Sequence, residues 1–307
     1  MMKLASLFML PAIPGALMAA EKKPALGYKV FTVTRPGLSR DVPPGKESLS
    51  WVANSATLIY GERDAVLVDT FLTIEQTQRL ADGIAASGKT LKAIYITHGH
   101  GDHFFGLRIL QDRFPEAKAW ATAAVVAKMR RQITPEQLDG RWRKLFPKQI
   151  PDPISIAEPL DGTRIDLEGH ALNVISLGHT DTDDSTCLHV PDIGLVVAGD
   201  AVYNGIHPYL VESNTQTRLE WIAALDKIEA LQAKAVVAGH KVPSNEDNPR
   251  TVAETRQYIR NFIRLNETTA TARELYEQML ALYPDWANPG SLWSAANAAK
   301  AQAQAKT

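Results

Sequence analysis

The chain has 307 residues, of which 45% are hydrophobic and 22% are charged, as is ordinary for a soluble globular protein. Its 33 Lys and Arg residues nearly balance its 34 Asp and Glu residues, and no block of basic residues stands out. Nucleic acid is therefore not expected as a partner, because phosphate binding needs a clustered positive face. The length suits one large domain or two small ones.

The first 20 residues, MMKLASLFMLPAIPGALMAA, differ from the rest of the chain. One early lysine, an apolar centre and small residues before a charged segment predict a secretory signal peptide, cleaved near Ala19 or Ala20. The alternatives are a membrane anchor and a buried helix, but Pro11 and Pro14 interrupt a run already too short to span a bilayer. We therefore predict a periplasmic or secreted protein with no stable membrane insertion after cleavage. The sequence gives no oligomeric state.

Strand and helix patterns alternate along the chain from residue 28 onward. Strands are predicted at 28–34, 55–61, 65–70, 91–97, 117–122, 163–167, 170–177, 185–191, 193–200 and 233–240, and helices at 74–88, 104–114 and 217–232. Residues 35–50 are rich in Pro, Gly and charge, and predict a long loop or hairpin. The polar-faced stretch 122–150, broken at Pro135, predicts a helical insertion that lies over another part of the fold.

Two stretches share one pattern. Residues 57–70 and 186–200 both consist of a strand, a turn, a buried strand and an aspartate, and a helix and a strand ending in histidine follow each. Two such halves predict an α/β fold, a four-layer αβ/βα sandwich of two mixed sheets with helices on the outer faces. We expect one domain over 27–250 and a C-terminal helical extension over 251–307, packed on that domain and frayed at its end.

Residues that can bind metals follow four of the predicted strands. The residues are His98, His100, Asp102, His103, His179, Asp200 and His240. Ligand sites in α/β folds assemble at the carboxyl ends of strands. Zinc accepts imidazole nitrogens and carboxylate oxygens, and seven such ligands exceed what one tetrahedral ion can use. The pattern therefore predicts a pair of ions.

The motif H-x-H-x-D-H, followed by a lone His, Asp and His, resembles the metallo-β-lactamase fold superfamily over roughly residues 28–245. The resemblance implies two Zn²⁺ ions, with manganese or iron as alternatives. It implies that His98, His100 and His179 hold the first ion, that Asp102, His103 and His240 hold the second, and that Asp200 bridges them. Asp69 matches an early aspartate that supports the histidine loop from behind the ligands.

The resemblance also implies a hydrolase, in which a hydroxide held between two zinc ions attacks a small, fairly apolar carbonyl-type substrate: an amide, ester, lactone or β-lactam-like compound. Asp102 is the predicted catalytic residue. Zinc β-lactamases usually carry Cys or Ser where this chain has Asp200, which disfavours efficient β-lactam hydrolysis. The alternatives are an isothiocyanate hydrolase, a lactonase and a thioesterase of the glyoxalase II type. An iron-dependent dioxygenase is the alternative from a different class.

A small-molecule pocket is predicted beside the metals. Tyr203 and Tyr209 follow Asp200 and are candidates to polarise a carbonyl, and His207 is a candidate to face the pocket. Phe104 and Trp142, together with Trp51, are candidates for an apolar lining.

Overall fold

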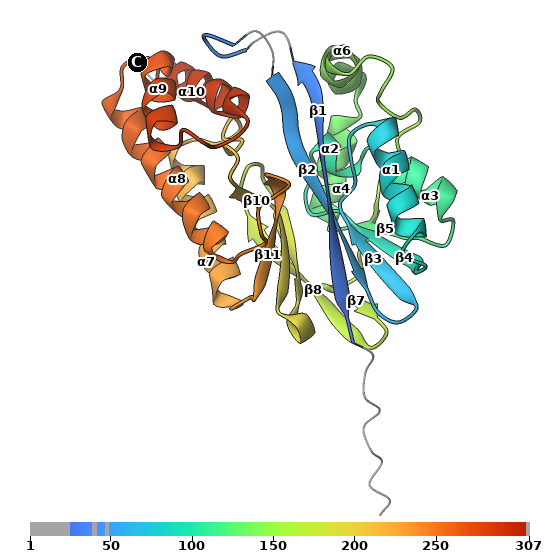
Figure 1. The fold of residues 1–307 in the computed structure, drawn as a ribbon. Helices are drawn as coiled ribbons and strands as arrows, with labels where there is room; N and C mark the ends of the chain where they lie inside the picture. Colours follow the sequence, from blue (N-terminus) through green and yellow to red (C-terminus); the bar gives the residue numbers. More distant parts are fainter. Residues whose placement is uncertain (1–24, 39–41, 47–48, 305–307) are drawn as a thin grey trace, which may run out of the picture.

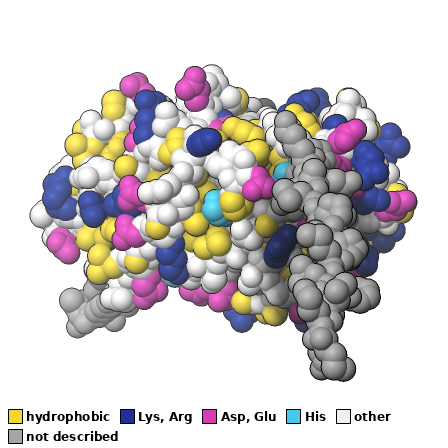
Figure 2. Space-filling model, turned by 90° about the horizontal axis from the view of Figure 1, so that it is seen from below, with side chains coloured by type: hydrophobic (Ala, Val, Ile, Leu, Met, Phe, Trp, Pro, Cys, Tyr) yellow, Lys and Arg dark blue, Asp and Glu magenta, His cyan; other side chains and the backbone are white. Residues whose placement is uncertain are grey.

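A computed structural model describes residues 25–38, 42–46 and 49–304 of the chain. The predicted signal peptide and the last three residues of the predicted frayed end lie outside the described residues. Within the described part, no helix is both long enough and apolar enough to cross a membrane. Figure 2 shows one face of the molecule, on which acidic and basic side chains are interspersed.

Hydrogen bonds join the described strands into one curled sheet. Its order is β6-β5-β4-β3-β2-β11-β10-β9-β8-β7, and β1 pairs with β2 outside this path. The strands are β1 (Gly27–Leu38), β2 (Leu49–Tyr60), β3 (Asp64–Val68), β4 (Thr90–Tyr95), β5 (Lys118–Ala121), β6 (Glu158–Pro159), β7 (Arg164–Leu167), β8 (His170–Gly178), β9 (Ser185–Val190), β10 (Leu195–Asn204) and β11 (Ala235–Lys241).

Helices cover the outer sides of this sheet (Figure 1). They are α1 (Ile74–Ala85), α2 (Gly101–Phe104), α3 (Leu107–Arg113), α4 (Ala123–Gln132), α5 (Pro135–Gln137), α6 (Arg143–Leu145), α7 (Thr215–Ala230), α8 (Arg250–Thr268), α9 (Ala272–Leu282) and α10 (Pro289–Gln304). A π-helical turn, η1 (Leu138–Trp142), and a 3₁₀ turn, η2 (Pro191–Ile193), complete the set.

The expected repetition of two halves is present. In one half, β3 is followed by α1 and then by the parallel strand β4, and in the other β10 is followed by α7 and the parallel strand β11. The mixed α/β architecture is confirmed. Two separate sheets are not confirmed, because the pair His240–Asn54 between β11 and β2 joins the halves into one sheet.

Three apolar clusters hold this arrangement together. One lies under α7 to α10 and includes Trp221 and Phe262, and a second lies under α1 to α4 and includes Phe104. The third joins the inner faces of the two halves through β-branched and aliphatic side chains such as Val68 and Val197. Burial of these side chains stabilises the packing of the two halves by about 25 cal/mol for each Å² of apolar surface. Residues of α8, α9 and α10 belong to the first cluster, so the C-terminal helices share the core of the main body.

The stretch expected as a loop at 35–50 differs from the prediction. β1 continues to Leu38 and β2 begins at Leu49, so strand pairing runs on past Pro36. The register of the pair shifts on both sides of that proline. Proline is tolerated here because β1 is an edge strand, which among the described strands pairs only with β2.

Candidate metal centre

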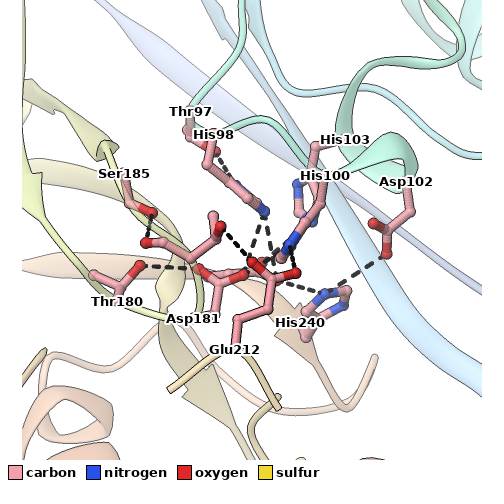
Figure 3. Close-up of polar contacts among 12 residues, drawn as sticks. Thr97, His98, His100, Asp102, His103, Thr180, Asp181, Ser185, Glu212 and His240 are labelled. Atoms are coloured by element: carbon pink, nitrogen blue, oxygen red, sulfur yellow. Dashed lines mark hydrogen bonds and ion pairs between the residues drawn. The ribbon is translucent and has the colours of Figure 1, made fainter. Parts of the chain in front are cut away.

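Four segments bring the predicted ligands to one place. His98 and His100 lie in the loop after β4, Asp102 and His103 in the short helix α2, Asp200 in β10 and His240 in β11. Figure 3 shows His98, His100, His103 and His240 converging with Asp102 and Asp181. Most of these side chains are less than a tenth exposed. The sharp backbone path needs glycine at one point, because a Cβ on Gly239 would lie only 2.1 Å from the Asp200 Oδ1 atom.

The side chains form three groups in which the ligand atoms all lie within 4.8 Å of one another. The groups are His98, His100, Asp181 and Asp200; Asp102, His103 and His240; and Asp69, His98 and His103. A tetrahedral ion with bonds of about 2.0 Å separates its ligand atoms by roughly 3.3 Å. Spacings of this order are what a bound cation requires.

Asp200 lies between the first two groups. Its Oδ2 atom is 2.8 Å from His240 Nε2 and 3.8 Å from His98 Nε2, and its Oδ1 atom is 3.2 Å from His103 Nε2. Asp181 Oδ2 is 2.9 Å from His100 Nδ1. A carboxylate placed between two groups of nitrogens is where a shared ligand of two ions would be.

One ring nitrogen of each imidazole in the cluster lies within hydrogen-bonding distance of a residue outside the cluster's centre. His103 Nδ1 is 3.0 Å from Asp69 Oδ2, and the same carboxylate accepts from both the amide and the hydroxyl of Thr97 at 2.8 Å. Because the Thr97 hydroxyl donates to Asp69, its oxygen can accept from His98 Nδ1 at 3.1 Å. Asp69 thus supports the histidine loop through contacts with two residues, and this places Nε2 of both rings toward the cluster.

The remaining rings follow the same rule with other partners. His240 Nδ1 donates to the backbone carbonyl of Ala53 at 2.9 Å. His100 is turned the other way: its Nε2 atom lies 3.1 Å from Glu212 Oε1, which leaves Nδ1 for the cluster. His179 Nδ1 lies 2.7 Å from Asp183 Oδ1. Such outer partners fix the tautomer and the orientation of a ligating ring.

The carboxylates are anchored in a comparable way. Asn54 Nδ2 donates to Asp102 Oδ2 at 3.0 Å, and the Tyr203 hydroxyl donates to Asp200 Oδ2 at 3.1 Å. The Thr180 hydroxyl donates to Asp181 Oδ1 at 2.9 Å. Each acid is therefore oriented by a neutral donor that leaves its negative charge in place.

Several buried atoms of these side chains have no hydrogen-bond partner among the described residues. They are Nε2 of His98, His103 and His179, Oδ2 of Asp181 and Oδ1 of Asp200. Buried polar atoms are nearly always satisfied in folded proteins, so the atoms of His98, His103, Asp181 and Asp200, which belong to the close groups, indicate a missing partner. Nitrogen and carboxylate donors of this kind fit a divalent cation.

Electrostatics favour positive charge in the same place. Burial opposes ionisation of Asp200, yet the His240, His103 and His98 rings outweigh burial and hold the pKa of this carboxyl well below its usual value. Burial lowers the pKa of His98. Burial acts the same way on His103, but the carboxylates of Asp200 and Asp69 raise the pKa of that ring well above its usual value. The carboxylates therefore draw cations into the cluster.

Comparison with known proteins agrees with this geometry. A family model described as the metallo-beta-lactamase superfamily matches residues 49–240. The chain belongs to the metallo-β-lactamase superfamily. A search of the curated proteins found no match.

Solved structures of the superfamily share the fold. A metallo-β-lactamase from Pontibacter korlensis superposes with a TM-score of 0.54 at 17% identity, covering 77% of this chain and 100% of that one. A metallo-β-lactamase family protein from Thermus thermophilus gives a TM-score of 0.58 at 20% identity, covering 90% and 94%. The metallo-β-lactamase DIM-1 gives 0.54 at 18% identity, covering 78% and 99%. At these identities the likeness is one of fold.

A cavity of about 510 Å³ lies over the cluster. His100, Asp102, Asp200 and His240 line it on the ligand side. The other lining residues are Trp51, Val52, Gly140, Arg141, Trp142, Lys144, Leu145, Tyr203, Tyr209, Asn288, Gly290, Ser291 and Ser294. Four of the residues predicted for a pocket, Trp51, Trp142, Tyr203 and Tyr209, line this cavity. The helical insertion over 122–150 lies at this cavity and supplies one of its walls.

Two pocket predictions are wrong. Phe104 is fully buried and packs edge-to-face on Phe105, because the first turn of α2 faces the core under α1 to α4. His207 is fully buried, and its Nδ1 atom lies 2.8 Å from the Tyr258 hydroxyl. Burial lowers the pKa of this ring to about 4. Neither residue lines the cavity within the described part of the chain.

The position of His179 differs from the implied set of seven. This residue is not a member of the three close groups formed by the described residues, whereas Asp181, two positions later, is. Its bare Nε2 atom is buried, and its other nitrogen is held by Asp183. Its assignment to the first ion stays a prediction.

The sequence reasoning missed several residues that orient or extend the cluster, among them Asn54, Asp181, Asp183 and Glu212. The acids of the run GHTDTDDS directly follow His179, so their position was a usable signal for two of them. Glu212 had no signal, because it is 112 positions from His100. Burial opposes ionisation of Glu212, but its hydrogen bond with His100 lowers the pKa of this acid to about 2.

Proposed function

We propose that this protein is a metal-dependent hydrolase that uses two divalent ions, zinc in the first place, to cleave a small, fairly apolar carbonyl-type substrate. One observation carries the proposal. Buried imidazole and carboxylate groups are each anchored at one polar atom and leave another bare, and their neighbours His100, Asp102, Asp200 and His240 line a cavity of about 510 Å³. A cavity of this size suits a small organic molecule.

The residues divide between two ions as the superfamily membership suggests. His98, His100 and His179 would hold one ion. Asp102, His103 and His240 would hold the other, and Asp200 would contact both. When bound, divalent cations supply a Lewis acid that makes water a nucleophile near neutral pH and polarises a carbonyl oxygen.

The surrounding side chains supply orientation and exclude water. Asn54 fixes Asp102, and the Tyr203 hydroxyl fixes Asp200. The ring of Tyr209 lies edge-on to His100, with centroids 5.6 Å apart, and forms part of the cavity wall. Tyr203 is committed to Asp200, so Tyr209 is the better candidate to contact the substrate carbonyl. Apolar walls favour a substrate with an apolar body.

Several substrate classes fit this chemistry. Asp200 stands where zinc β-lactamases usually carry Cys or Ser, so we place amides, esters and lactones ahead of β-lactams. An isothiocyanate or a thioester is an alternative substrate. An iron-dependent dioxygenase is the alternative from a different reaction class, and it would require iron in the purified protein.

The test combines metal analysis of the purified protein with a hydrolysis panel. The panel contains a chromogenic β-lactam, an acyl-homoserine lactone, a phosphodiester, a thioester and an isothiocyanate. We expect about two zinc ions per chain and turnover of a lactone or a related carbonyl compound. The variant Asp102→Ala should lose at least about 100-fold in turnover, since it removes a ligand. Asp161→Ala, at an exposed bend, is the control.

Unchanged turnover in Asp102→Ala would contradict the mechanism. Iron in place of zinc, with oxygen consumption and no hydrolysis, would support the dioxygenase instead. β-Lactam turnover far above the rest of the panel would overturn the argument from Asp200.

We also propose export to the periplasm or the cell exterior, supported by the leader-like first 20 residues. Mass spectrometry of the protein expressed in full should find a new amino terminus near Ala20. An intact Met1 would contradict export by this route.

A further inference from the structure

One cation of the helical insertion lies beside the ligand loop, and the proposed hydrolysis gives it no role. Lys128 belongs to α4, and its side chain is 18% exposed. A Cβ atom on Gly99, between His98 and His100, would lie only 2.4 Å from the Lys128 Cβ atom. The stem of this lysine therefore packs directly on the loop that carries two candidate ligands, which restricts where its ammonium group can reach.

The Lys128 ammonium binds the segment that follows β8. Its Nζ atom donates to Asp183 Oδ2 at 3.0 Å and to the hydroxyl of Thr182 at 3.3 Å. An ammonium group has three N–H donors, so one lysine can make both hydrogen bonds at once. Lys128 thus joins α4 to two neighbouring residues, and each of these leads to an imidazole of the candidate metal centre.

Asp183 connects Lys128 to His179. One carboxylate oxygen accepts from the lysine, and the other, Oδ1, lies 2.7 Å from His179 Nδ1. The Asp183 side chain is 62% exposed, so without the ammonium it would be free to turn toward water. By binding the outer oxygen, Lys128 favours the orientation in which the inner oxygen meets the imidazole.

Thr182 and Glu212 form a second connection, which ends at His100. The Thr182 hydroxyl oxygen accepts from Lys128, and its hydrogen is donated to Glu212 Oε2 at 2.7 Å. The other oxygen of Glu212 lies 3.1 Å from His100 Nε2, and Figure 3 shows these two side chains beside each other. A hydroxyl that accepts from a cation is a stronger donor, so Lys128 strengthens the contact that fixes this acid.

Both connections end on candidate ligands of the same ion. His100 and His179 belong, with His98, to the set proposed for the first ion. The partners that orient the other set are Asn54, Asp69 and the backbone carbonyl of Ala53. Within the described part of the chain, the Lys128 ammonium donates to Thr182 and Asp183 and to none of these partners. One cation is thus connected to two ligands of one ion.

We propose that Lys128 is a positioning residue that strengthens the binding of the first ion. It holds Asp183 against His179 directly. Through the threonine hydroxyl it holds Glu212 against His100. The inference rests on the proposed function, because that function places an ion at these two rings. Outer partners of ligating histidines typically contribute about tenfold to 100-fold in metal affinity.

The sign of the effect distinguishes positioning from a simple effect of charge. A positive charge near the centre repels a divalent cation, so loss of the Lys128 charge alone would tighten metal binding. Loss of its hydrogen bonds would release the two acids and weaken metal binding. Ion pairs with exposed carboxylates contribute little to folding, so the metal-free protein should keep its stability.

The test measures the dissociation constants of both zinc ions by competition with a fluorescent chelator. In Lys128→Met, which keeps the unbranched stem and removes the ammonium, one ion should bind about tenfold more weakly and the other within about twofold of the wild-type protein. Lys128→Arg keeps the charge and the N–H donors and should recover most of the loss. Arg130→Met is the matched control, because it removes an equal charge from an exposed position of the same helix.

A spectroscopic measurement assigns the effect to the first ion. In the protein loaded with Co²⁺, the paramagnetic ions displace the NMR signals of the ring N–H protons of ligating histidines. The signals that Asp183→Asn and Glu212→Gln alter belong to His179 and His100. We expect these same signals to exchange faster with water in Lys128→Met, while the remaining ring signals stay as in the wild-type protein.

Combined variants test the route through the two acids. When Asp183→Asn and Glu212→Gln are already present, the lysine has no carboxylate to hold, so adding Lys128→Met should change zinc affinity by less than about twofold. A tenfold loss that persists in this background would overturn the inference. Circular dichroism of the metal-free variants verifies folding, and Lys128→Gln provides the same comparison if Lys128→Met does not fold.

The outcomes separate the two proposals. Unchanged or tighter zinc binding in Lys128→Met, or equal weakening of both ions, would overturn the role of Lys128 and leave the metal-dependent hydrolase standing. Selective weakening of one ion, with recovery in Lys128→Arg, would support both proposals. If the wild-type protein takes up no metal, both proposals fall.

Discussion

At the scale of single residues, Asp181 resembles the predicted ligands, because it is buried, is oriented by a neutral donor and lies beside an imidazole nitrogen. One of its oxygens accepts from Thr180, and the other is buried and lies 2.9 Å from His100 Nδ1. The run in which it lies also contains Asp183, which holds His179. One short segment thus contains both a supported imidazole, His179, and a carboxylate of the cluster, Asp181.

We therefore predict that Asp181→Asn weakens zinc binding by tenfold or more, because it removes a negative charge beside the bare nitrogens. The estimate, about 1.4 kcal/mol or more, is the scale seen when groups around a metal site are changed. A competition titration with a zinc-chelating dye measures the affinity. Asp184→Asn is the control, since Asp184 is exposed and belongs to no ligand group among the described residues. Equal affinity in the two variants would show that Asp181 takes no part in binding.

Most candidate ligands could be predicted from the sequence, although Asp181 was missed, whereas apart from Asp69 the groups that orient them could not. The candidate ligands from His98 to His103 lie within six consecutive positions after a strand, so their spacing along the sequence is enough to predict that they lie close together. Glu212 and Asn54 meet their partners only after the chain folds, and nothing near them in sequence marks the contact. Two of the pocket predictions failed for a related reason: whether Phe104 points to the cavity or to the core depends on which face of α2 packs into the apolar cluster under the neighbouring helices.

The start of α7 connects helix stability to the cluster at the scale of elements. Asn214 caps this helix, accepting from the amides of Gln216 and Thr217 at 2.9 and 3.1 Å, and Thr217 caps it in return. Glu212, which holds His100, lies two residues before the cap. The path of the chain into α7 therefore sets the position of an outer partner of the metal centre.

Asn214→Ala should lower the free energy of unfolding by about 1 kcal/mol, the usual cost of losing an N-cap acceptor. Urea denaturation followed by circular dichroism gives the value. Asn214→Asp keeps the acceptor and should remain close to the wild-type protein. If both variants lose the same stability, the side-chain oxygen is not what stabilises the helix.

The order of the elements could be predicted from periodicity, but two of their shapes could not. β1 and β2 run further than expected, because pairing between two strands offsets the poor local strand propensity near Pro36. The π-helical turn has no local signature in its five residues, Leu138–Trp142. The packing of Trp142 against Trp51 and Phe146 accompanies it, and its contact with Trp51 joins residues far apart in the chain.

At the scale of the whole molecule, metal binding and folding are one equilibrium. The candidate ligands span residues 98–240 and meet only in the folded chain, so an ion held by them stabilises the folded state. We expect Zn²⁺ at about 1,000 times its dissociation constant to stabilise the protein by about 4 kcal/mol. Thermal unfolding with and without a chelator measures this. The rise in Tm should shrink in His240→Ala and persist in His189→Ala, which changes a partly exposed ring outside the cluster.

The joint between β2 and β11 has a mechanical consequence. A single backbone pair, His240 with Asn54, bridges the two halves of the sheet. His240 is itself a candidate ligand, and the side-chain amide of Asn54 donates a hydrogen bond to Asp102. A change in the pairing of β2 with β11 would therefore change the positions of two residues of the candidate metal centre at once.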